Sequence, residues 1–303
     1  MFSIAQNRQR KNVSHIKDIL EKNIRTIEEL ADRKGELRGI TTGFKALNNV
    51  TSGLQKADLI IIAARPSMGK TAFALNIATN TAKAGQKVLI FSLEMSEEQL
   101  TERILSTEAL VEIKKLREGT IDADEWEKVL DARERLEKLD LMIDDTPGIS
   151  ALEVKNKCKR VKMKGGLDLV VIDYLQLMTF EGKTESRQLE ISALTRYLKQ
   201  LARELDCPVI VLSQLSRAVE SRKSDEKKPV LSDLRESGSI EQDADMVLFL
   251  YREDYYKKEE STRPNECDII IEKHRHGPTD TVVLTWVGRY TRFSDMVQGN
   301  LNI

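Results

Sequence analysis

A short loop at residues 64–71 has the sequence Ala-Arg-Pro-Ser-Met-Gly-Lys-Thr and follows the apolar run Leu59–Ala63. It matches the phosphate-binding P-loop, except that alanine replaces the first glycine. Gly69 lets the backbone approach a phosphate, and successive N–H groups at the start of the following helix cradle negative charge. Lys70 is predicted to reach the β- and γ-phosphates, and the Thr71 hydroxyl to bind Mg²⁺. The alternative is a chance strand–turn–helix that contains Gly-Lys-Thr.

Three further apolar runs end in polar side chains, at the end of a parallel sheet where ligands bind. Asp173 follows the run Leu169–Ile172, a Walker-B pattern, and is predicted to hold Mg²⁺ through its water shell. Glu94 is predicted to orient and deprotonate an attacking water, although it could also serve as an N-terminal helix charge, because Ser96 begins a helical pattern. Gln214 could sense a γ-phosphate by hydrogen bonding, and Asp173 alone could be a plain strand-end carboxylate.

The elements that must position these residues alternate along the chain from Ile40 onward. Short apolar runs separated by amphipathic helices indicate an α/β fold with a mostly parallel sheet covered on both faces. One helix is indicated after Gln188, and another contains Trp126, Val129 and Leu136 on one face. The strand candidates are Leu59–Ala63, Lys87–Leu93, Leu139–Asp144, Leu167–Asp173, Pro208–Ser213, Met246–Leu250, Asp268–Glu272 and Thr281–Val287. The polar stretches Glu220–Pro229 and Glu253–Glu266 are predicted to be exposed loops.

The first segment, residues 1–38, has a different character from the rest. Apolar residues recur at three- and four-residue steps between Ile16 and Ala31, which predicts an amphipathic helix over about 14–34. Ser14 can cap its start and Gly35 can end it. The helix could pack on its own domain, or it could be a linker helix that packs on a neighbouring subunit.

Composition limits the class of protein. The chain has 303 residues, 48 Lys+Arg against 49 Asp+Glu, 40% hydrophobic and 32% charged residues. These values exclude a disordered tail protein, a collagen, a small disulfide scaffold and a polycation that coats nucleic acid by net charge.

Cysteine usage and the N-terminus indicate the compartment. The cysteines Cys158, Cys207 and Cys267 lie far apart, form no Cys-x-x-Cys pair and accompany only three histidines, so no zinc framework is indicated. The longest apolar runs are too short to span a bilayer, and residues 1–8 contain no signal-peptide core. We therefore expect a cytoplasmic protein with no membrane association.

Five motifs in order form a recognisable set. They are Ala-Arg-Pro-Ser-Met-Gly-Lys-Thr (64–71), Ser-Leu-Glu-Met (92–95), Val-Ile-Asp-Tyr-Leu-Gln-Leu (171–177), Leu-Ser-Gln-Leu-Ser-Arg (212–217) and Asp-Leu-Arg-Glu-Ser-Gly-Ser-Ile-Glu-Gln-Asp-Ala-Asp (233–245). Together they resemble the motor domain of the bacterial and phage replicative DNA helicases, the DnaB family, over residues 39–303. The resemblance implies a RecA-like ATPase that uses ATP and Mg²⁺, forms a homo-hexameric ring, encircles single-stranded DNA and translocates 5′ to 3′. It also implies a helicase loader as a partner, in a bacterial cell or a phage-infected bacterium.

The resemblance assigns roles to the matching residues. Those implied to bind the nucleotide phosphates and Mg²⁺ are Ser67, Gly69, Lys70, Thr71 and Ala72. Glu94 is similar to the catalytic base, Asp173 to the Walker-B acid and Gln214 to the coupling sensor. Arg103, nine residues after Glu94, matches an arginine that supports the site.

A basic segment near the C-terminus resembles the family's Lys-x-Arg element. Lys273 and Arg275 are implied to reach the ATP of the adjacent subunit, where a cation stabilises charge on the transferred phosphoryl group. The alternative is an exposed basic turn. His274 and His276 have no acidic or cysteine partner in register, so we expect them to face solvent and to bind no metal.

The segment Arg235-Glu236-Ser237-Gly238 resembles the channel loop that holds the DNA backbone. Arg235 would contact a phosphate by charge, Glu236 through its backbone N–H, and Gly238 would let a main-chain N–H approach another phosphate. Such contacts position a strand without reading its bases. The alternative is a polar turn before a helix at Ser239–Asp245.

Two other functions share the P-loop. One is a RecA-like recombination ATPase, and the other is a module in which ATP drives assembly only; the motifs at 92–95 and 233–238 favour the helicase motor. Full-length family members carry a helical N-terminal domain that recruits primase. This chain begins near the linker helix, so we expect a truncated form, no primase recruitment, and a ring that depends on the helix at Ile16–Ala31.

Overall fold

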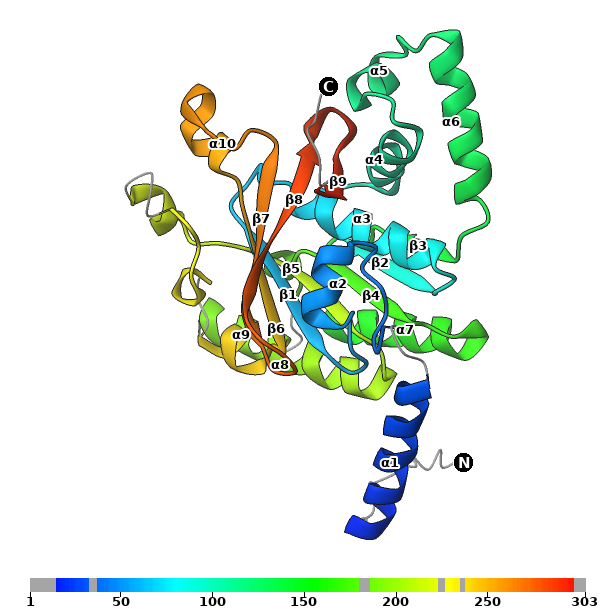
Figure 1. Ribbon diagram of the computed structural model, residues 1–303, viewed down its shortest axis with the longest axis vertical. Helices are drawn as coiled ribbons and strands as arrows, with labels where there is room; N and C mark the ends of the chain where they lie inside the picture. Colours follow the sequence, from blue (N-terminus) through cyan, green and yellow to red (C-terminus); the bar gives the residue numbers. More distant parts are fainter. Residues whose placement is uncertain (1–14, 33–36, 180–185, 223–226, 235–237, 297–303) are drawn as a thin grey trace. The chain divides into compact units, whose positions relative to one another are not determined.

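The computed structural model describes residues 15–32, 37–179, 186–222, 227–234 and 238–296. Residues 39–303 form the larger of two units, and a nine-stranded sheet with the order β3-β2-β4-β5-β1-β6-β7-β8-β9 lies at its centre (Figure 1). The strands are β1 (Leu59–Ala64), β2 (Val88–Ser92), β3 (Leu141–Asp144), β4 (Leu169–Asp173), β5 (Val209–Gln214), β6 (Met246–Tyr251), β7 (Glu266–His274), β8 (Asp280–Val287) and β9 (Arg292–Asp295).

The strands from β3 to β6 in sheet order run parallel, and β7, β8 and β9 continue the sheet antiparallel. The predicted α/β fold with a mostly parallel sheet is therefore confirmed, and each predicted strand is present. Strand β9 was not predicted, because Arg-Phe-Ser-Asp is short and mostly polar. It pairs antiparallel with the preceding strand β8 across a short connection.

Helices cover both faces of the sheet, which is why the parallel strands are apolar throughout. Successive side chains of β1 point to opposite faces: Ile60 and Ile62 pack beneath α2 (Lys45–Thr51) and α3 (Lys70–Lys83), whereas Leu59 and Ile61 pack in the other core. That second core is covered by two further helices. They are α7 (Ala151–Gly165) and α8 (Arg187–Leu205).

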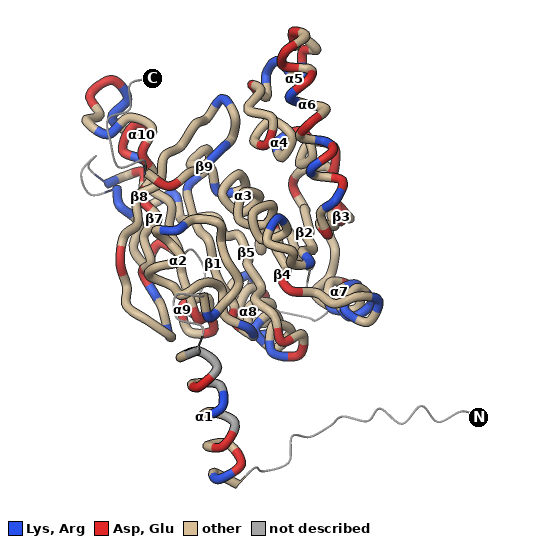
Figure 2. Tube along the Cα trace, turned by 45° about the vertical axis from the view of Figure 1, so that its right-hand side comes forward, with Lys and Arg blue, Asp and Glu red and all other residues tan. Residues whose placement is uncertain are grey.

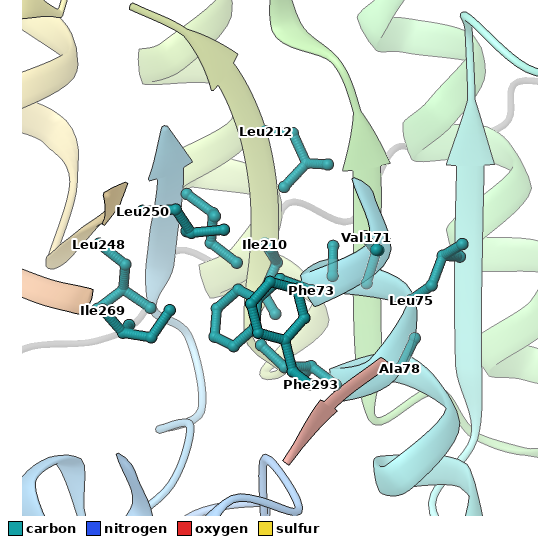
Figure 3. Close-up of a cluster of buried hydrophobic side chains, with 14 of the residues drawn as sticks. Phe73, Leu75, Ala78, Val171, Ile210, Leu212, Leu248, Leu250, Ile269 and Phe293 are labelled. Atoms are coloured by element: carbon teal, nitrogen blue, oxygen red, sulfur yellow. The ribbon is translucent and has the colours of Figure 1, made fainter. Parts of the chain in front are cut away.

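The core beneath α3 is built around aromatic rings (Figure 3). Phe73 stacks on Phe44 with ring centroids 5.5 Å apart and meets Phe293 of β9 edge-on at 5.2 Å. The ring centroid of Trp286 in β8 lies 4.5 Å from that of Phe293. The C-terminal hairpin is therefore packed against the helix that follows the P-loop, and each such aromatic pair adds about 0.5–1.5 kcal/mol beyond burial of its area.

The remaining helices are α4 (Glu97–Ala109), α5 (Ile113–Glu118), α6 (Ala123–Leu136), α9 (Gly238–Asp243) and α10 (Glu253–Lys257). Ser96 caps α4 in a capping box with Gln99, as its position after β2 suggested. The prediction of a loop over Glu253–Glu266 was wrong in part. Acidic residues in the first turn of α10 and Lys257 in its last turn complement the helix dipole, so a charged stretch forms a helix.

The smaller unit, residues 1–38, contains one described helix, α1 (Ile16–Asp32). The predicted helix is present, whereas its expected cap Ser14 and its expected end at Gly35 lie outside the described residues. Ile16, Ile24 and Ile27 are all more than half exposed. An apolar helical stripe exposed to this degree is a surface that other proteins usually cover.

Both basic and acidic residues occur on the helices of the larger unit, although α7 is mostly basic (Figure 2). The basic residues of α7 are partly balanced by acids of neighbouring elements, in ion pairs such as Lys157–Asp144 with β3 and Lys155–Glu204 with α8. Within the described ranges, no helix combines the length and the apolar character that crossing a bilayer requires.

Candidate active site

The P-loop joins β1 to α3 at the carboxyl end of the parallel strands. Ser67 and Gly69 both have positive φ, 67° and 95°, and Gly69 is the N-cap of α3. This backbone turns N–H groups toward the space in front of the helix, where the helix dipole favours an anion. A Cβ at position 69 would lie 3.0 Å from Cζ of Phe293, so both the conformation and the packing require glycine.

Three side chains lie close together at the carboxyl end of the strands: Lys70, Thr71 and Asp173. The Thr71 hydroxyl donates to Asp173 Oδ2 at 2.7 Å, and Lys70 Nζ lies 3.9 Å from Asp173 Oδ1. Burial lowers the pKa of Lys70, while the charges of Asp173 and Glu94 oppose that shift. Nζ of Lys70 also lies 4.7 Å from the ring centroid of Tyr174. The lysine is thus held next to, but not in contact with, the carboxylate.

The oxygen atoms near Thr71 fit the magnesium ion that the P-loop implies. Oδ1 of Asp173 is buried and, among the described residues, accepts no hydrogen bond. A buried carboxylate oxygen without a donor is costly unless a cation or water completes its shell. Hydroxyl and carboxylate oxygens are the ligands that Mg²⁺ prefers. Thr71 and Asp173 are therefore suited to hold this ion.

A cleft of about 490 Å³ opens in front of these residues. Its lining brings together the predicted residues Ser67, Gly69, Lys70, Thr71, Ala72, Glu94, Arg103 and Gln214. They come from the ends of β1, β2 and β5 and from α3 and α4. Asp173, at the end of β4, contacts the cleft through Thr71. The parallel topology explains this convergence, since all these strands end on the same side of the sheet.

Glu94 is an exposed carboxylate within the electrostatic range of Lys70, Arg103 and Tyr174. Its position is fixed by neighbouring backbone: Leu93 N donates to the Asp173 carbonyl at 2.7 Å. The hydroxyl of Ser92 bonds the Met95 carbonyl at 2.6 Å. A rigid turn therefore presents a free carboxylate to the cleft.

Arg103 of α4 lines the cleft with an incomplete set of partners. Its Nε is buried and has no acceptor among the described residues, and burial together with the charge of Arg117 lowers its pKa. Asp173 and Glu94 partly offset that shift. A buried guanidinium N–H without an acceptor fits a site that receives an anion.

Lys273 and Arg275 lie at the opposite end of the sheet from the P-loop. Lys273 Nζ donates to the carbonyl of Glu241, and Arg275 Nη2 donates to that of Gln242 at 2.5 Å. Arg275 also lies 3.4 Å from Asp245 Oδ1. Neither cation lines the cleft described above. Because β6 and β7 are antiparallel, the end of β7 returns to the amino end of β6, away from the nucleotide loop.

The prediction for His274 and His276 was wrong in part: His276 is exposed as expected, but it has an acidic partner. His276 Nε2 lies 3.2 Å from Asp58 Oδ1, a residue far away in sequence that the fold brings to the same end of the sheet. His274 Nδ1 lies 3.2 Å from the Pro278 carbonyl, and its Nε2 is buried. Sequence spacing did not reveal Asp58, because the contact crosses from the start of β1 to the end of β7.

The expected DNA loop is only partly covered by the structure. Arg235 and Glu236 lie outside the described residues, and Gly238 is the first residue of α9. The helix expected at Ser239–Asp245 is thus present with slightly different bounds. The roles of these residues stay predictions.

Comparison with known proteins decides the family. Residues 39–295 match the family model described as DnaB-like helicase C terminal domain. The chain belongs to this family. It is 50% identical over 299 residues to the replicative DNA helicase DnaC of Bacillus subtilis (strain 168), and 49% identical over 298 residues to the replicative DNA helicase DnaB of Geobacillus stearothermophilus. These matches cover 97% and 98% of this chain but 65% of each relative, so the chain spans about 65% of the length of the curated relatives it matches.

Solved structures of this family share the fold. One of them, an ATPase domain, superposes with a TM-score of 0.89 at 39% identity and covers 94% of this chain and 100% of the other. A DnaB-like replicative helicase, described with its interactions with primase, gives 0.86 at 39% identity and covers 94% of this chain and 68% of the other. The expected family and RecA-like fold are confirmed.

The DnaB-like cleft also contains residues that the sequence did not single out, among them Arg117, Tyr174, Trp286 and Thr291. Tyr174 follows Asp173 directly, and that adjacency was a usable signal. Trp286 and Thr291 reach the cleft because β8 and β9 fold back against α3. Their sequence surroundings carry no comparable signal, so only the fold could identify them.

Proposed function

We propose that this chain is the ATP-hydrolysing motor of a replicative DNA helicase that works as a hexameric ring and translocates 5′ to 3′ on single-stranded DNA. The P-loop backbone and Lys70 bind the phosphates of ATP, and Glu94 orients and deprotonates the attacking water. Gln214 at the end of β5 senses the γ-phosphate. Mg²⁺, held by Thr71 and by Asp173 through water, supplies charge neutralisation on the phosphates when it is bound.

One observation supports the ring in particular: the two cations expected at the γ-phosphate are too far from their own cleft. Asp245, which holds Arg275, is bonded to the backbone at Leu59, whereas the P-loop begins at Ala64. The strand between them is about 16 Å long at roughly 3.3 Å per residue. This exceeds the reach of a lysine or arginine side chain, so Lys273 and Arg275 act on the ATP of an adjacent subunit.

The interfaces of the proposed ring use the unit outside the motor. Residues 1–38 are a linker whose helix α1 presents exposed Ile16, Ile24 and Ile27 to a neighbouring subunit. Single-stranded DNA is held by Arg235, Glu236 and Gly238 through phosphate contacts. A helicase loader is a further partner, and the bacterial cytoplasm or that of a phage-infected cell is the proposed location.

A subunit-mixing experiment tests the shared site. Lys70→Ala removes the lysine of the cleft, and Arg275→Ala removes the cation donated to the neighbour, so each variant alone should lose ATP hydrolysis. A mixture should regain activity, since some interfaces then combine an intact Lys70 with an intact Arg275. Arg203→Ala, an exposed arginine on α8, serves as the control and should keep the parent rate. Full activity of Arg275→Ala, or a mixture no better than the sum of its parts, would contradict the shared site.

Unwinding distinguishes the helicase from the other ATPases with this fold. The parent should unwind a forked duplex in the presence of ATP, and Arg235→Ala should lose unwinding while it retains nucleotide binding. Filament formation on DNA without unwinding would instead support a recombination ATPase. Rings that form without DNA-stimulated turnover would support an assembly module.

A further inference from the structure

Two cations, Lys273 and Arg275, are held at the carboxyl-terminal end of helix α9, which lies beside the start of β6 (Figure 1). Lys273 Nζ donates to the carbonyls of Glu241 and Gln242, and Arg275 Nη2 donates to that of Gln242 at 2.5 Å. The last carbonyls of a helix have no partner inside the helix, and the helix dipole makes this end negative, so it attracts cations. Helix α9 therefore brings the two side chains to one place.

A buried carboxylate, that of Asp245, holds Arg275 through both the main chain and the side chain. Arg275 N donates to the Asp245 carbonyl at 2.9 Å, and Arg275 Nη1 lies 3.4 Å from Asp245 Oδ1. Asp245 is 3% exposed and is itself fixed to the start of β1. Its N donates to the Leu59 carbonyl at 2.9 Å, and its Oδ2 accepts from Leu59 N at 2.8 Å and from Lys199 Nζ. The carboxylate therefore connects the guanidinium to the centre of the sheet.

The residue that follows Arg275 is held by a second buried carboxylate. His276 Nε2 lies 3.2 Å from Oδ1 of Asp58, which is 3% exposed and directly precedes β1. The Asp58 carbonyl accepts from Val209 N, at the start of β5, at 2.9 Å. Asp58 and Asp245 stand at the starts of two adjacent parallel strands, β1 and β6. They contact consecutive residues of one turn, so the fold fixes this turn at two neighbouring points.

These contacts leave donors for an anion. A guanidinium has five N–H groups, and in the contacts made with the described residues the side chain of Arg275 uses two of them. This side chain is 43% exposed. Burial and then the charge of Arg275 lower the pKa of Lys273, and the charge of Asp245 opposes that shift. Asp245 thus orients one cation and favours the charged form of the other.

We propose that Asp245 is a positioning residue for ATP hydrolysis at the neighbouring subunit. It fixes the guanidinium of Arg275 at the place where this group meets the neighbour's phosphates, and Asp58 supports that position through His276. The inference rests on the proposed function, because it takes Arg275 as a cation that acts on the ATP of an adjacent subunit. Such a cation must be correctly placed, since an error of about 1 Å in a catalytic arrangement can cost about 100-fold in rate.

A matched aspartate separates positioning from plain structural support. Asp268 in β7 is 2% exposed, against 3% for Asp245, and it too is contacted by one arginine and one lysine, Arg263 and Lys228. Asp245→Asn and Asp268→Asn should therefore lower the free energy of unfolding by similar amounts. Only Asp245→Asn should lower kcat, by about 10–100-fold. Its KM for ATP should equal that of the parent, because its own cleft is intact.

Subunit mixing shows which cleft Asp245 serves. Mixing Asp245→Asn with Lys70→Ala should restore activity, because some interfaces then combine an intact Lys70 with a correctly held Arg275. Mixing Asp245→Asn with Arg275→Ala should restore nothing, because neither kind of subunit supplies a correctly placed cation. A gain of activity in this second mixture would show that Asp245→Asn damages its own cleft, and it would overturn the inference. Equal kcat values for Asp245→Asn and Asp268→Asn would also overturn it.

His276→Ala provides a second variant that folds independently of the buried carboxylates, since the His276 side chain is 50% exposed. It should lower kcat less than Asp245→Asn does and should give the same results in both mixtures. If Asp245→Asn does not fold, the parent kcat in His276→Ala would overturn the inference. Full activity of Arg275→Ala would overturn the shared site of the proposed function, and the inference with it.

Discussion

Each end of the parallel sheet contains a buried aspartate next to a lysine, but the contacts of the two aspartates differ. At the carboxyl end, Lys70 Nζ lies 3.9 Å from Asp173 Oδ1, and this oxygen has no hydrogen-bond partner among the described residues. At the amino end, Asp245 Oδ2 accepts from Leu59 N at 2.8 Å and from Lys199 Nζ. Filled acceptors hold Asp245 in the fold, whereas Asp173 keeps an oxygen without a hydrogen bond next to the cleft; Asp58 Oδ2 at the amino end is also buried without one, so the position beside the cleft distinguishes Asp173.

The amino end also shows why a cluster of ligand-type residues is not by itself a metal site. Asp58, Asp245 and His276 offer atoms that lie within 4.8 Å of one another. However, Lys199 and Arg275 already contact Asp245, so cationic charge is present without a metal ion. Among the described residues, Asp173 at the carboxyl end is not contacted by two cations in this way. The position of the lysine relative to the carboxylate therefore separates a structural end from a reactive one.

The largest expected effect is a loss of stability from a substitution at the amino end of the sheet, which we call the structural end. Lys199→Met should lower the free energy of unfolding by about 3–5 kcal/mol, because it removes the lysine that is ion-paired with the buried Asp245. Urea denaturation would measure the loss, with Lys138→Met as the control, since Lys138 pairs with Glu134 at an exposed position. Nucleotide affinity of folded Lys199→Met should match the parent. A selective loss of affinity without loss of stability would contradict the division of roles between the two ends.

The next effect is a loss of ATP hydrolysis from a substitution at the carboxyl end of the sheet, which we call the reactive end. Lys70→Ala should reduce ATP hydrolysis by at least about 100-fold, equal to about 2.7 kcal/mol, because a positioned cation is lost from the phosphates. Phosphate release under saturating ATP would measure it. Lys83→Ala on the same helix, which removes an ion pair with Glu108, is the control and should retain activity. Equal losses in the two variants would show that helix α3, and not the lysine, was affected.

A third effect separates backbone strain from ligand binding. Gly69→Ala and Gly85→Ala both place a side chain at positive φ, 95° and 83°, so each should cost about 1–2 kcal/mol of stability. Only position 69 faces the cleft, and only there does the added Cβ meet Phe293, at 3.0 Å. Calorimetry should show weaker nucleotide binding for Gly69→Ala and unchanged binding for Gly85→Ala. Weaker binding in both would mean that loss of stability, and not the loop, explains the effect.

The smallest effect concerns pH at the structural end. Burial, followed by the charge of Asp245, raises the pKa of Asp58 above 3.8, while His276 and Lys199 lower it. A carboxyl with a raised pKa in the folded state contributes stability below its unfolded pKa and loses it as the pH rises through the folded value. Asp58→Asn, which does not ionise, should therefore gain stability relative to the parent between pH 4 and neutrality. The urea midpoints of Asp58→Asn and of the parent, measured across that pH range and again in a His276→Gln background, would show this gain. A difference between the two midpoints that does not change with pH would contradict the prediction.

Much of the reactive end was predictable because its residues lie in contiguous motifs. The loop 64–71 and the strand ends at Glu94, Asp173 and Gln214 each follow an apolar run, and a parallel sheet brings all such ends to one side. Arg103 was also placed correctly at the cleft, one helix beyond Glu94. Local sequence sufficed here because the chemistry is carried by the turns themselves.

The structural end was not predictable, because its partners are distant in sequence. Asp58 precedes β1, Lys199 lies in α8 and His276 follows β7, so no motif links them. The partner of His276 was missed for this reason, whereas β9 was missed because its four residues are mostly polar, although it pairs with the preceding strand β8. Each of these contacts depends on sheet order and on the antiparallel return of β7.

The sequence by itself determined the family, the α/β fold and most of the predicted residues that line the cleft, since hydrophobic period and loop motifs are local properties of the chain. Only the tertiary structure decided which carboxylate oxygens lack a hydrogen-bond partner, Asp173 Oδ1 and Asp58 Oδ2 among them. It also decided that Lys273 and Arg275 lie at the end of the sheet opposite their own cleft, and that Arg65 is bonded to the segment after Gln214. These outcomes depend on which distant groups supply hydrogen bonds and charge at close range, and that information exists only after the chain has folded.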